Sequence, residues 1–258
     1  MRDENTMLRY IEAEPDDIRR IVRDRERYTA AFVKHFLSHP VKRVYLSGNG
    51  SPHSVCVVAG MCMERLLGVE ASSSLPAVLN RHTPFNANGV YRPEEMLLIC
   101  PAQTGRTTGP IESARLARAA GIPVLCTTLS PGGALARECD IVIEKPTGFE
   151  ESFPESRGHV ASMVILLLCA VEAARALGRL DADEYRRWMD GFERLPESCG
   201  RAADADRDAV GRNDLHDVVL LEFALDTTNA HRKQARRLGT QQSLVRPLVD
   251  MQFSLGET

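Results

Sequence analysis

Short strand-like runs alternate with amphipathic stretches along the first 178 residues of the chain, and this alternation predicts its secondary structure. The predicted strands are residues 41–48, 69–74, 95–102, 122–129 and 139–145. Apolar residues at helical spacing predict helices at residues 14–38, 51–68, 109–121, 132–139 and 158–178. Strands that each lead into a crossover are typical of a parallel sheet with both faces covered. The expected fold class is therefore α/β: a five-stranded, parallel, doubly wound (flavodoxin-like) sheet with helices on both faces and an added N-terminal helix.

The composition changes after residue 178. Residues 180–212 are strongly charged, and they predict a helix that acts as a spacer rather than as part of a core. The last stretch has the pattern strand, helix, strand, and two parallel strands cannot cover their own faces. This piece is therefore the opening of a second sheet, or it docks on the first domain or on a partner chain. The expected division is a helical lead-in (1–40), an α/β domain (41–178), a helical linker (179–212) and a partial second α/β unit (213–258).

Charge and composition narrow the class of protein. The formal net charge is −3 and the sequence has no long basic block, which argues against a nucleic-acid partner. The first residues are too acidic for a signal peptide, and the longest apolar run, 160–174, contains Glu172 and is shorter than a membrane span. Seven cysteines without a C-x-x-C pair favour free thiols. We expect a cytoplasmic protein with no membrane or nucleic-acid partner.

Two loops that follow predicted strands are rich in glycine and hydroxyl side chains. The first, 47–54, contains Gly48, Gly50 and Ser51, and the second, 102–109, has three threonines and two glycines. Both precede helices, whose N-termini offer free N–H groups and the positive end of the helix dipole to an anion. Neither loop has the lysine of a nucleotide P-loop or a G-x-G-x-x-G pattern. We expect a small phosphorylated metabolite to bind here, without a metal or a cofactor.

The chain resembles the sugar isomerase (SIS) domain family in several motifs: GNGS, AQTGRTTGPIESARLARAAGIPVLCTT, SPGGALARECDIVI and GFEESFPESRGH. Its double-domain members include the isomerase half of glucosamine-6-phosphate synthase, AgaS-type ketose/aldose isomerases and fructosamine-6-phosphate deglycases. The resemblance covers residues 7–178 well and the remainder poorly. It implies the same fold, a sugar-phosphate ligand and a homodimer or higher homo-oligomer.

The resemblance also assigns the phosphate loops. In the family the second loop usually reads S-Q-S-G-x-T, and its hydroxyls bind the sugar phosphate together with a serine of the first loop. The matching residues are Gly50, Ser51, Gln103, Thr104, Gly105 and Thr107. Here Ala102 replaces the opening serine, and Arg106 stands at a varied, often acidic position. We expect weakened phosphate binding, with Arg106 either contacting the ligand or pointing into solvent.

Sugar isomerisation needs a base that carries a proton between two carbons, and a second group that handles the sugar oxygens. By the resemblance, Glu150 or Glu151 faces the sugar, and Arg157 matches a basic residue often found there. The alternative is an acidic loop with Ser156 as a helix cap. The catalytic glutamate and histidine of double-domain relatives lie in the second domain, and those positions read Gly239 and Leu255 here. Neither side chain transfers a proton.

Three explanations remain open at this point. The chain is a non-catalytic sugar-phosphate sensor or subunit, or an aldose–ketose isomerase or fructosamine-6-phosphate deglycase that uses other groups, or its reading frame is incomplete. The candidate catalytic residues in the first domain are His53, His82, Glu150, Glu151, Glu155 and His159. His53 is expected in the first turn of a helix, close to the first glycine loop. The apolar 158–178 helix suggests a subunit interface, because it is apolar on more than one face.

Overall fold

The computed structural model describes residues 6–82, 85–151 and 155–206. A single five-stranded sheet lies within these residues, and all of its strands are parallel, in the order β2-β1-β3-β4-β5. The predicted α/β class and strand number are confirmed. The strands are β1 (Arg43–Ser47), β2 (Glu70–Ser74), β3 (Met96–Pro101), β4 (Val124–Thr128) and β5 (Ile141–Glu144).

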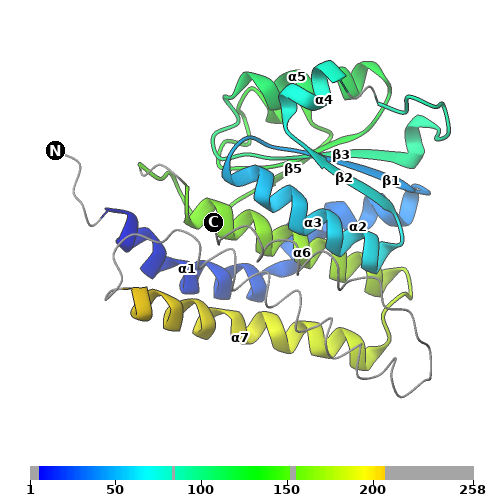
Figure 1. Cartoon of the computed structure of the whole chain (residues 1–258). Coiled ribbons are helices and arrows are strands. Elements are labelled where there is room, and N and C mark those ends of the chain that lie inside the picture. The colour runs from blue at the N-terminus through cyan, green and yellow to red at the C-terminus, as the bar shows by residue number, and fades with distance from the viewer. Residues whose placement is uncertain (1–5, 83–84, 152–154, 207–258) are drawn as a thin grey trace, which may run out of the picture.

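Helices cover both faces of the sheet (Figure 1). One face carries α4 (Pro76–His82) and α5 (Thr108–Ala119), and the other carries α2 (Arg25–Ser38), α3 (Ser51–Leu67) and α6 (Arg157–Ala176). An outer layer beyond α6 holds α1 (Thr6–Arg23) and α7 (Ala182–Asp206). Two short 3-10 helices, Pro93–Glu95 and Ala136–Glu138, precede β3 and β5.

The sheet separates two hydrophobic clusters, because successive side chains of a strand point to opposite faces. In β3, Leu97 and Ile99 join the cluster with α3 and α6, whereas Leu98 and Cys100 join the cluster with α5. Every residue of β3 is buried. This explains why its sequence is a continuous apolar run rather than an alternating one.

Two predicted helices differ from the structure. The helix expected at 14–38 is two helices, because the chain leaves helical geometry at Asp24, which separates α1 from α2. The helix expected at 132–139 is reduced to a single 3-10 turn, Ala136–Glu138. Gly132 and Gly133, which lie in the preceding turn, disfavour a regular helix at that point.

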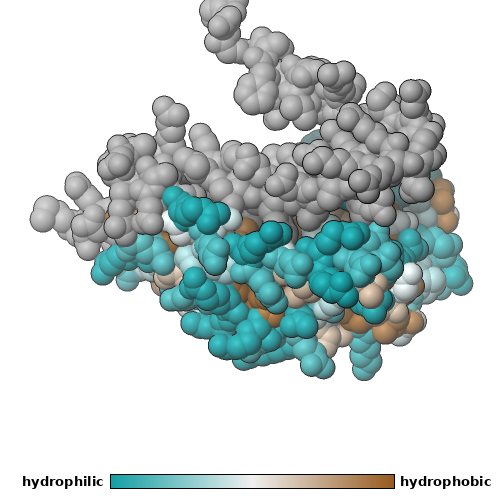
Figure 2. Space-filling model, turned by 90° about the horizontal axis from the view of Figure 1, so that it is seen from below, coloured by the Kyte–Doolittle hydropathy of each residue, from teal (hydrophilic) through white to brown (hydrophobic). Residues whose placement is uncertain are grey.

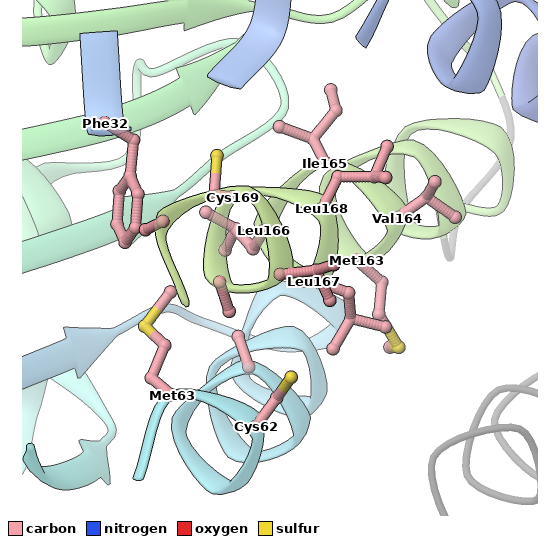
Figure 3. Packing of buried hydrophobic residues seen from close by; sticks show 14 of the residues in the cluster. Phe32, Cys62, Met63, Met163, Val164, Ile165, Leu166, Leu167, Leu168 and Cys169 are labelled. Atoms are coloured by element: carbon pink, nitrogen blue, oxygen red, sulfur yellow. The ribbon is translucent and has the colours of Figure 1, made fainter. Parts of the chain in front are cut away.

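The apolar helix α6 is the centre of the helical side of the core. Every residue from Gly158 to Val171 is buried, and α1, α2, α3 and α7 all pack against the helix. Phe32 of α2 and Met63 of α3 lie on different sides of it (Figure 3). The helix is long and apolar enough to cross a membrane, but 83% of its most apolar window is buried inside the protein, as predicted for a core helix.

The apolar composition of α6 therefore does not indicate a subunit interface, contrary to the expectation from the sequence. The helix is apolar all round because neighbours of the same chain surround it, so its composition carries no argument for an oligomer. The part of the described surface that is seen from below is mostly hydrophilic, with scattered apolar residues (Figure 2).

The charged helix α7 is not a spacer. Its buried side chains Trp188, Phe192, Leu195 and Cys199 recur at helical spacing and belong to the same cluster as α6. The helix packs along α1 and closes the outer layer. The high charge of residues 180–212 concealed this apolar stripe. The predicted β-α-β unit at 213–258, with Gly239 and Leu255, lies outside the described residues.

Candidate functional site

The two glycine-and-hydroxyl loops meet at the point where the sheet changes direction. β1 leads through α3 to β2 at one edge, whereas its neighbour β3 leads through α5 toward β4 and the other edge. The two helices lie on opposite faces, so the loops that follow β1 and β3 diverge. Open α/β sheets bind their ligands at such a point, beyond the carboxyl ends of the strands.

The first loop is a tight turn that opens α3. Gly50 adopts a φ of +63° and is the N-cap of the helix, so the N-cap residue has no side chain that could cap this end. A Cβ on Gly48 would lie 2.8 Å from the carbonyl carbon of Pro52, so the turn requires glycine there. Ser51 begins the helix half-buried, and the His53 N–H donates to the Gly50 carbonyl at 2.8 Å.

The second loop connects β3 to α5 and is held by the loop that follows β4. Gly105 adopts a φ of +63°, and its carbonyl accepts the Leu135 N–H at 3.1 Å. The Gln103 carbonyl accepts the Leu129 N–H at 2.8 Å and the Thr128 hydroxyl at 3.1 Å. These hydrogen bonds hold the backbone of the second loop in place. None of them uses a side chain of that loop.

The side chains of this loop are turned outward to different degrees. Thr107 is the N-cap of α5 and is exposed, and its hydroxyl makes no capping hydrogen bond. Thr104 is half-buried, and Arg106 is exposed, as in the solvated interpretation. Ala102 is half-buried and packs against the cluster around α5. The missing hydroxyl at position 102 is thus replaced by an apolar contact.

The two loops adjoin each other. A Cβ on Gly109, in the first turn of α5, would lie 3.3 Å from Nδ2 of Asn49 in the first loop. Two buried nitrogens of these loops, Nδ1 of His53 and Nε2 of Gln103, have no hydrogen-bond partner in the part of the chain that the structure describes. A buried polar atom without a partner costs about 1–3 kcal/mol, so a ligand or water that bonds these atoms is stabilised there.

Glu150 does not face this site, which corrects the expectation for this residue. It is 2% exposed, and its Oε1 accepts the Gly158 N–H at 2.6 Å. Its Oε2 accepts the Ser156 N–H, the Ser156 hydroxyl and the Arg157 N–H, each at 3.1 Å. The carboxylate therefore caps the N-terminus of α6, where a negative charge is favoured. The alternative, in which Ser156 caps the helix, is wrong in its residue: the Ser156 side chain makes no capping hydrogen bond, and Glu150 caps the helix instead.

The other catalytic candidates are spread along the sheet edge. Glu151 is exposed, and its N–H donates to the Tyr10 hydroxyl at 3.2 Å. His82 ends α4 and is exposed, and His159 is buried in the first turn of α6. Only His53 lies in one of the two loops at the switch point.

A buried ion pair at the end of β5 was missed in the sequence. Nζ of Lys145 lies 2.7 Å from Oε1 of Glu155 and 3.1 Å from the Gly158 carbonyl, and both side chains are almost fully buried. Burial lowers the pKa of Lys145, while Glu155 opposes that shift. The available signal was a lysine directly after an apolar strand, but the sequence did not identify its partner.

Arg157 is also engaged. Its Nε lies 2.7 Å from Oδ2 of Asp17 on α1, and its NH2 nitrogen lies 3.0 Å from Oδ1, so the pair is bidentate. This pairing raises the pKa of Arg157. Within the described residues, no group of three or more histidine, cysteine or acidic side chains is arranged to hold a metal ion.

Two relatives of the same name are similar to this chain in sequence. No protein-family model matches the chain. The chain is 26% identical to glutamine–fructose-6-phosphate aminotransferase (isomerizing) of Symbiobacterium thermophilum over 161 residues. These residues make up 62% of this chain and 26% of that protein. The enzyme of the same name from Aeropyrum pernix is 27% identical over 171 residues, or 65% of this chain and 26% of the relative. The chain thus spans about a quarter of the length of these relatives.

Solved structures share the fold. The C-terminal domain of glucosamine-fructose-6-phosphate aminotransferase from Francisella tularensis matches with a TM-score of 0.69 and 16% identity, over 80% of this chain and 58% of that chain. Tagatose-6-phosphate ketose/aldose isomerase from Escherichia coli matches with a TM-score of 0.56 and 16% identity, over 79% and 56% of the two chains.

Proposed function

We propose that this chain, whose α/β unit has the SIS fold, binds a sugar phosphate at the switch point between β1 and β3. The observation that carries the proposal is the meeting of two helix N-termini, those of α3 and α5, neither of which is capped by a side chain of its own N-cap residue. The free N–H groups of both helices favour an anion. The similar proteins are named for reactions of fructose 6-phosphate and tagatose 6-phosphate, which supports a phosphorylated sugar as that anion.

The proposed phosphate contacts divide between backbone and side chains. Gly50 and Gly105 provide the left-handed backbone that turns both loops tightly. The hydroxyls of Ser51, Thr104 and Thr107 and the amide of Gln103 then donate to the phosphate oxygens. Hydrogen bonds to a charged group contribute about 1.5–3 kcal/mol each, so this set holds a phosphate without a lysine.

We propose aldose–ketose isomerisation or fructosamine-6-phosphate deglycation as the reaction class. Glu150 caps α6, so of the candidates Glu150, Glu151 and His53 we propose His53 or Glu151 as the catalytic residue. His53 is the better placed, because it lies two residues after Ser51 and has a buried Nδ1 with no partner among the described residues. Imidazole is the side chain best suited to exchange protons near neutral pH.

A non-catalytic sugar-phosphate sensor or subunit is the second candidate. It is favoured by the position of Glu150, which removes a carboxylate from the site while the phosphate loops keep their form. The test combines binding and turnover on the purified chain. Calorimetry with inorganic phosphate, fructose 6-phosphate, glucose 6-phosphate and glucosamine 6-phosphate measures affinity, and a coupled assay measures ketose or aldose formation. Binding without turnover selects the sensor, and absence of binding by all four ligands contradicts both candidates.

We also propose a cytoplasmic homo-oligomer. All seven cysteines are free thiols, which suits a reducing compartment. With α6 covered, the remaining support for an interface is the exposed apolar pair Val57 and Met61, one helical turn apart on α3. Sedimentation at micromolar concentration measures the assembly, and a stable monomer would contradict it.

A further inference from the structure

A buried hydroxyl group lies beneath the second loop, at the end of β4. Thr128 is the last residue of that strand and is 0% exposed. Its Oγ1 donates to the Gln103 carbonyl at 3.1 Å and accepts the Ser130 N–H at 3.1 Å. A Cβ on Gly105 would lie 3.5 Å from the same oxygen. One hydroxyl therefore joins the second loop to the loop that follows β4, acting as donor to one and as acceptor from the other.

These contacts set the direction of one peptide group in the second loop. The Gln103 carbonyl points toward β4, because it accepts both the Thr128 hydroxyl and the Leu129 N–H. A trans peptide is planar and its N–H points away from its carbonyl, so the N–H of Thr104 points away from β4. Since β3 lies between β4 and β1, that is the direction of the first loop. The Thr104 N–H makes no backbone hydrogen bond within the residues that the structure describes, so it is available to a ligand between the two loops.

We propose that Thr128 is a positioning residue of the sugar-phosphate site, whose hydroxyl holds the Gln103–Thr104 peptide so that the Thr104 N–H faces the phosphate. This inference rests on the proposed function. Thr128 acts from beneath the loop and does not contact the ligand. A donor that is already held in place needs no reordering when the anion binds, which favours binding. Because the hydroxyl orients a backbone N–H toward the phosphate, its loss should weaken every ligand that carries this group.

The preceding residue, Thr127, is a matched control for Thr128. It is also 0% exposed, and its Oγ1 donates to the Ser162 hydroxyl of α6 at 3.1 Å. Successive residues of a strand point to opposite faces of the sheet, so Thr127 and Thr128 bond different neighbours. Replacement of either threonine by valine removes one buried hydroxyl and keeps the shape of the side chain. Both changes should lower stability, but only the change at Thr128 removes a hydrogen bond to the second loop.

Calorimetry with inorganic phosphate and with fructose 6-phosphate tests the positioning role. Thr128→Val should raise the Kd of both ligands about 3- to 10-fold, the equivalent of one neutral hydrogen bond. Thr128→Ser keeps the hydroxyl and should bind as the wild type does. Thr127→Val should also keep the wild-type Kd. Urea unfolding of each variant shows that it is folded and measures its loss of stability.

Three results would overturn the inference while the proposed function stands: an unchanged Kd in Thr128→Val, an equal rise of Kd in Thr127→Val, or a Kd in Thr128→Ser as high as that in Thr128→Val. The second of these would mean that binding follows stability in general. Failure of the wild-type chain to bind either ligand is a different outcome, because it contradicts the proposed function and the inference together.

A measurement on the wild-type chain covers the case in which Thr128→Val does not fold. Nuclear magnetic resonance follows the amide proton of Thr104 during titration with inorganic phosphate. We expect this resonance to shift with the bound fraction and its exchange with solvent to slow, because the N–H gains an acceptor. Phosphate binding that leaves both properties of the Thr104 amide unchanged would overturn the inference.

Discussion

Oε1 of Glu150 accepts the N–H of Gly158 at 2.6 Å, so a carboxylate near the end of one loop closes the first turn of α6. The other oxygen of Glu150 binds the two residues before Gly158. This arrangement gives the first prediction, because it assigns Glu150 to folding rather than to chemistry. Glu150→Ala removes the acceptor of three N–H groups, one of them buried, and should lower the free energy of unfolding by about 1–3 kcal/mol.

The matched control is Glu151→Ala. Glu151 is exposed, so its loss should change stability by about 0.5 kcal/mol or less. Urea unfolding measures both variants. Equal stability of Glu150→Ala and the wild type would contradict the capping role.

The second prediction concerns the buried pair of Lys145 and Glu155. Lys145→Met removes the cation and leaves Glu155 in a position where its side chain is 8% exposed, so the loss should be about 3–5 kcal/mol. The double variant Lys145→Met with Glu155→Leu removes both charges and should lose less than the single variant. Thermal and urea unfolding of the two variants provide the comparison, and a double variant that is the less stable of the two would contradict the argument.

The third prediction tests the phosphate loops. Thr107→Val keeps the shape of the side chain but removes the hydroxyl, and it should weaken sugar-phosphate binding by about 1.5–3 kcal/mol, which is roughly 10- to 150-fold in Kd. Thr108→Val is the control, since Thr108 is the exposed neighbour that begins α5 and has no proposed contact. Calorimetry with the tightest of the four ligands measures both, and equal Kd values for Thr107→Val and the wild type would remove Thr107 from the site.

The fourth prediction is a decline of stability as the pH rises from 4.5 toward about 9. The pKa of Glu14 rises from 4.5 to about 9 on folding, so between these values the folded chain holds a proton that the unfolded chain has released. Stability from this group is complete below pH 4.5 and is lost as pH rises toward 9, by up to about 1.4 kcal/mol per pH unit. Glu14→Gln should flatten this part of the profile. Urea unfolding at a series of pH values gives the slope, and identical slopes in both proteins would show that Glu14 is not the group concerned.

The sequence by itself determined the sheet and the place of the candidate site. Continuous apolar strands such as 95–102 alternate with helices, and this local periodicity follows directly from burial on both faces. The two glycine loops could be located because they follow strands, and the carboxyl ends of parallel strands share one edge. Once β1 and β3 are neighbours, the loops after them must adjoin.

Only the tertiary structure decided what the charged residues do. The sequence around Glu150 is compatible both with a side chain that faces a sugar and with one that caps a helix. The N–H groups that donate to its carboxylate in the structure show that it caps α6. Lys145 and Arg157 likewise depend on Glu155 and Asp17, which the fold brings to them. The apolar stripe of α7 is part of the core because α1 packs along it. The sequence could not show this, because burial depends on neighbours that are distant in the chain. Periodicity is a local property, whereas a charge takes its role from the atoms that surround it after folding.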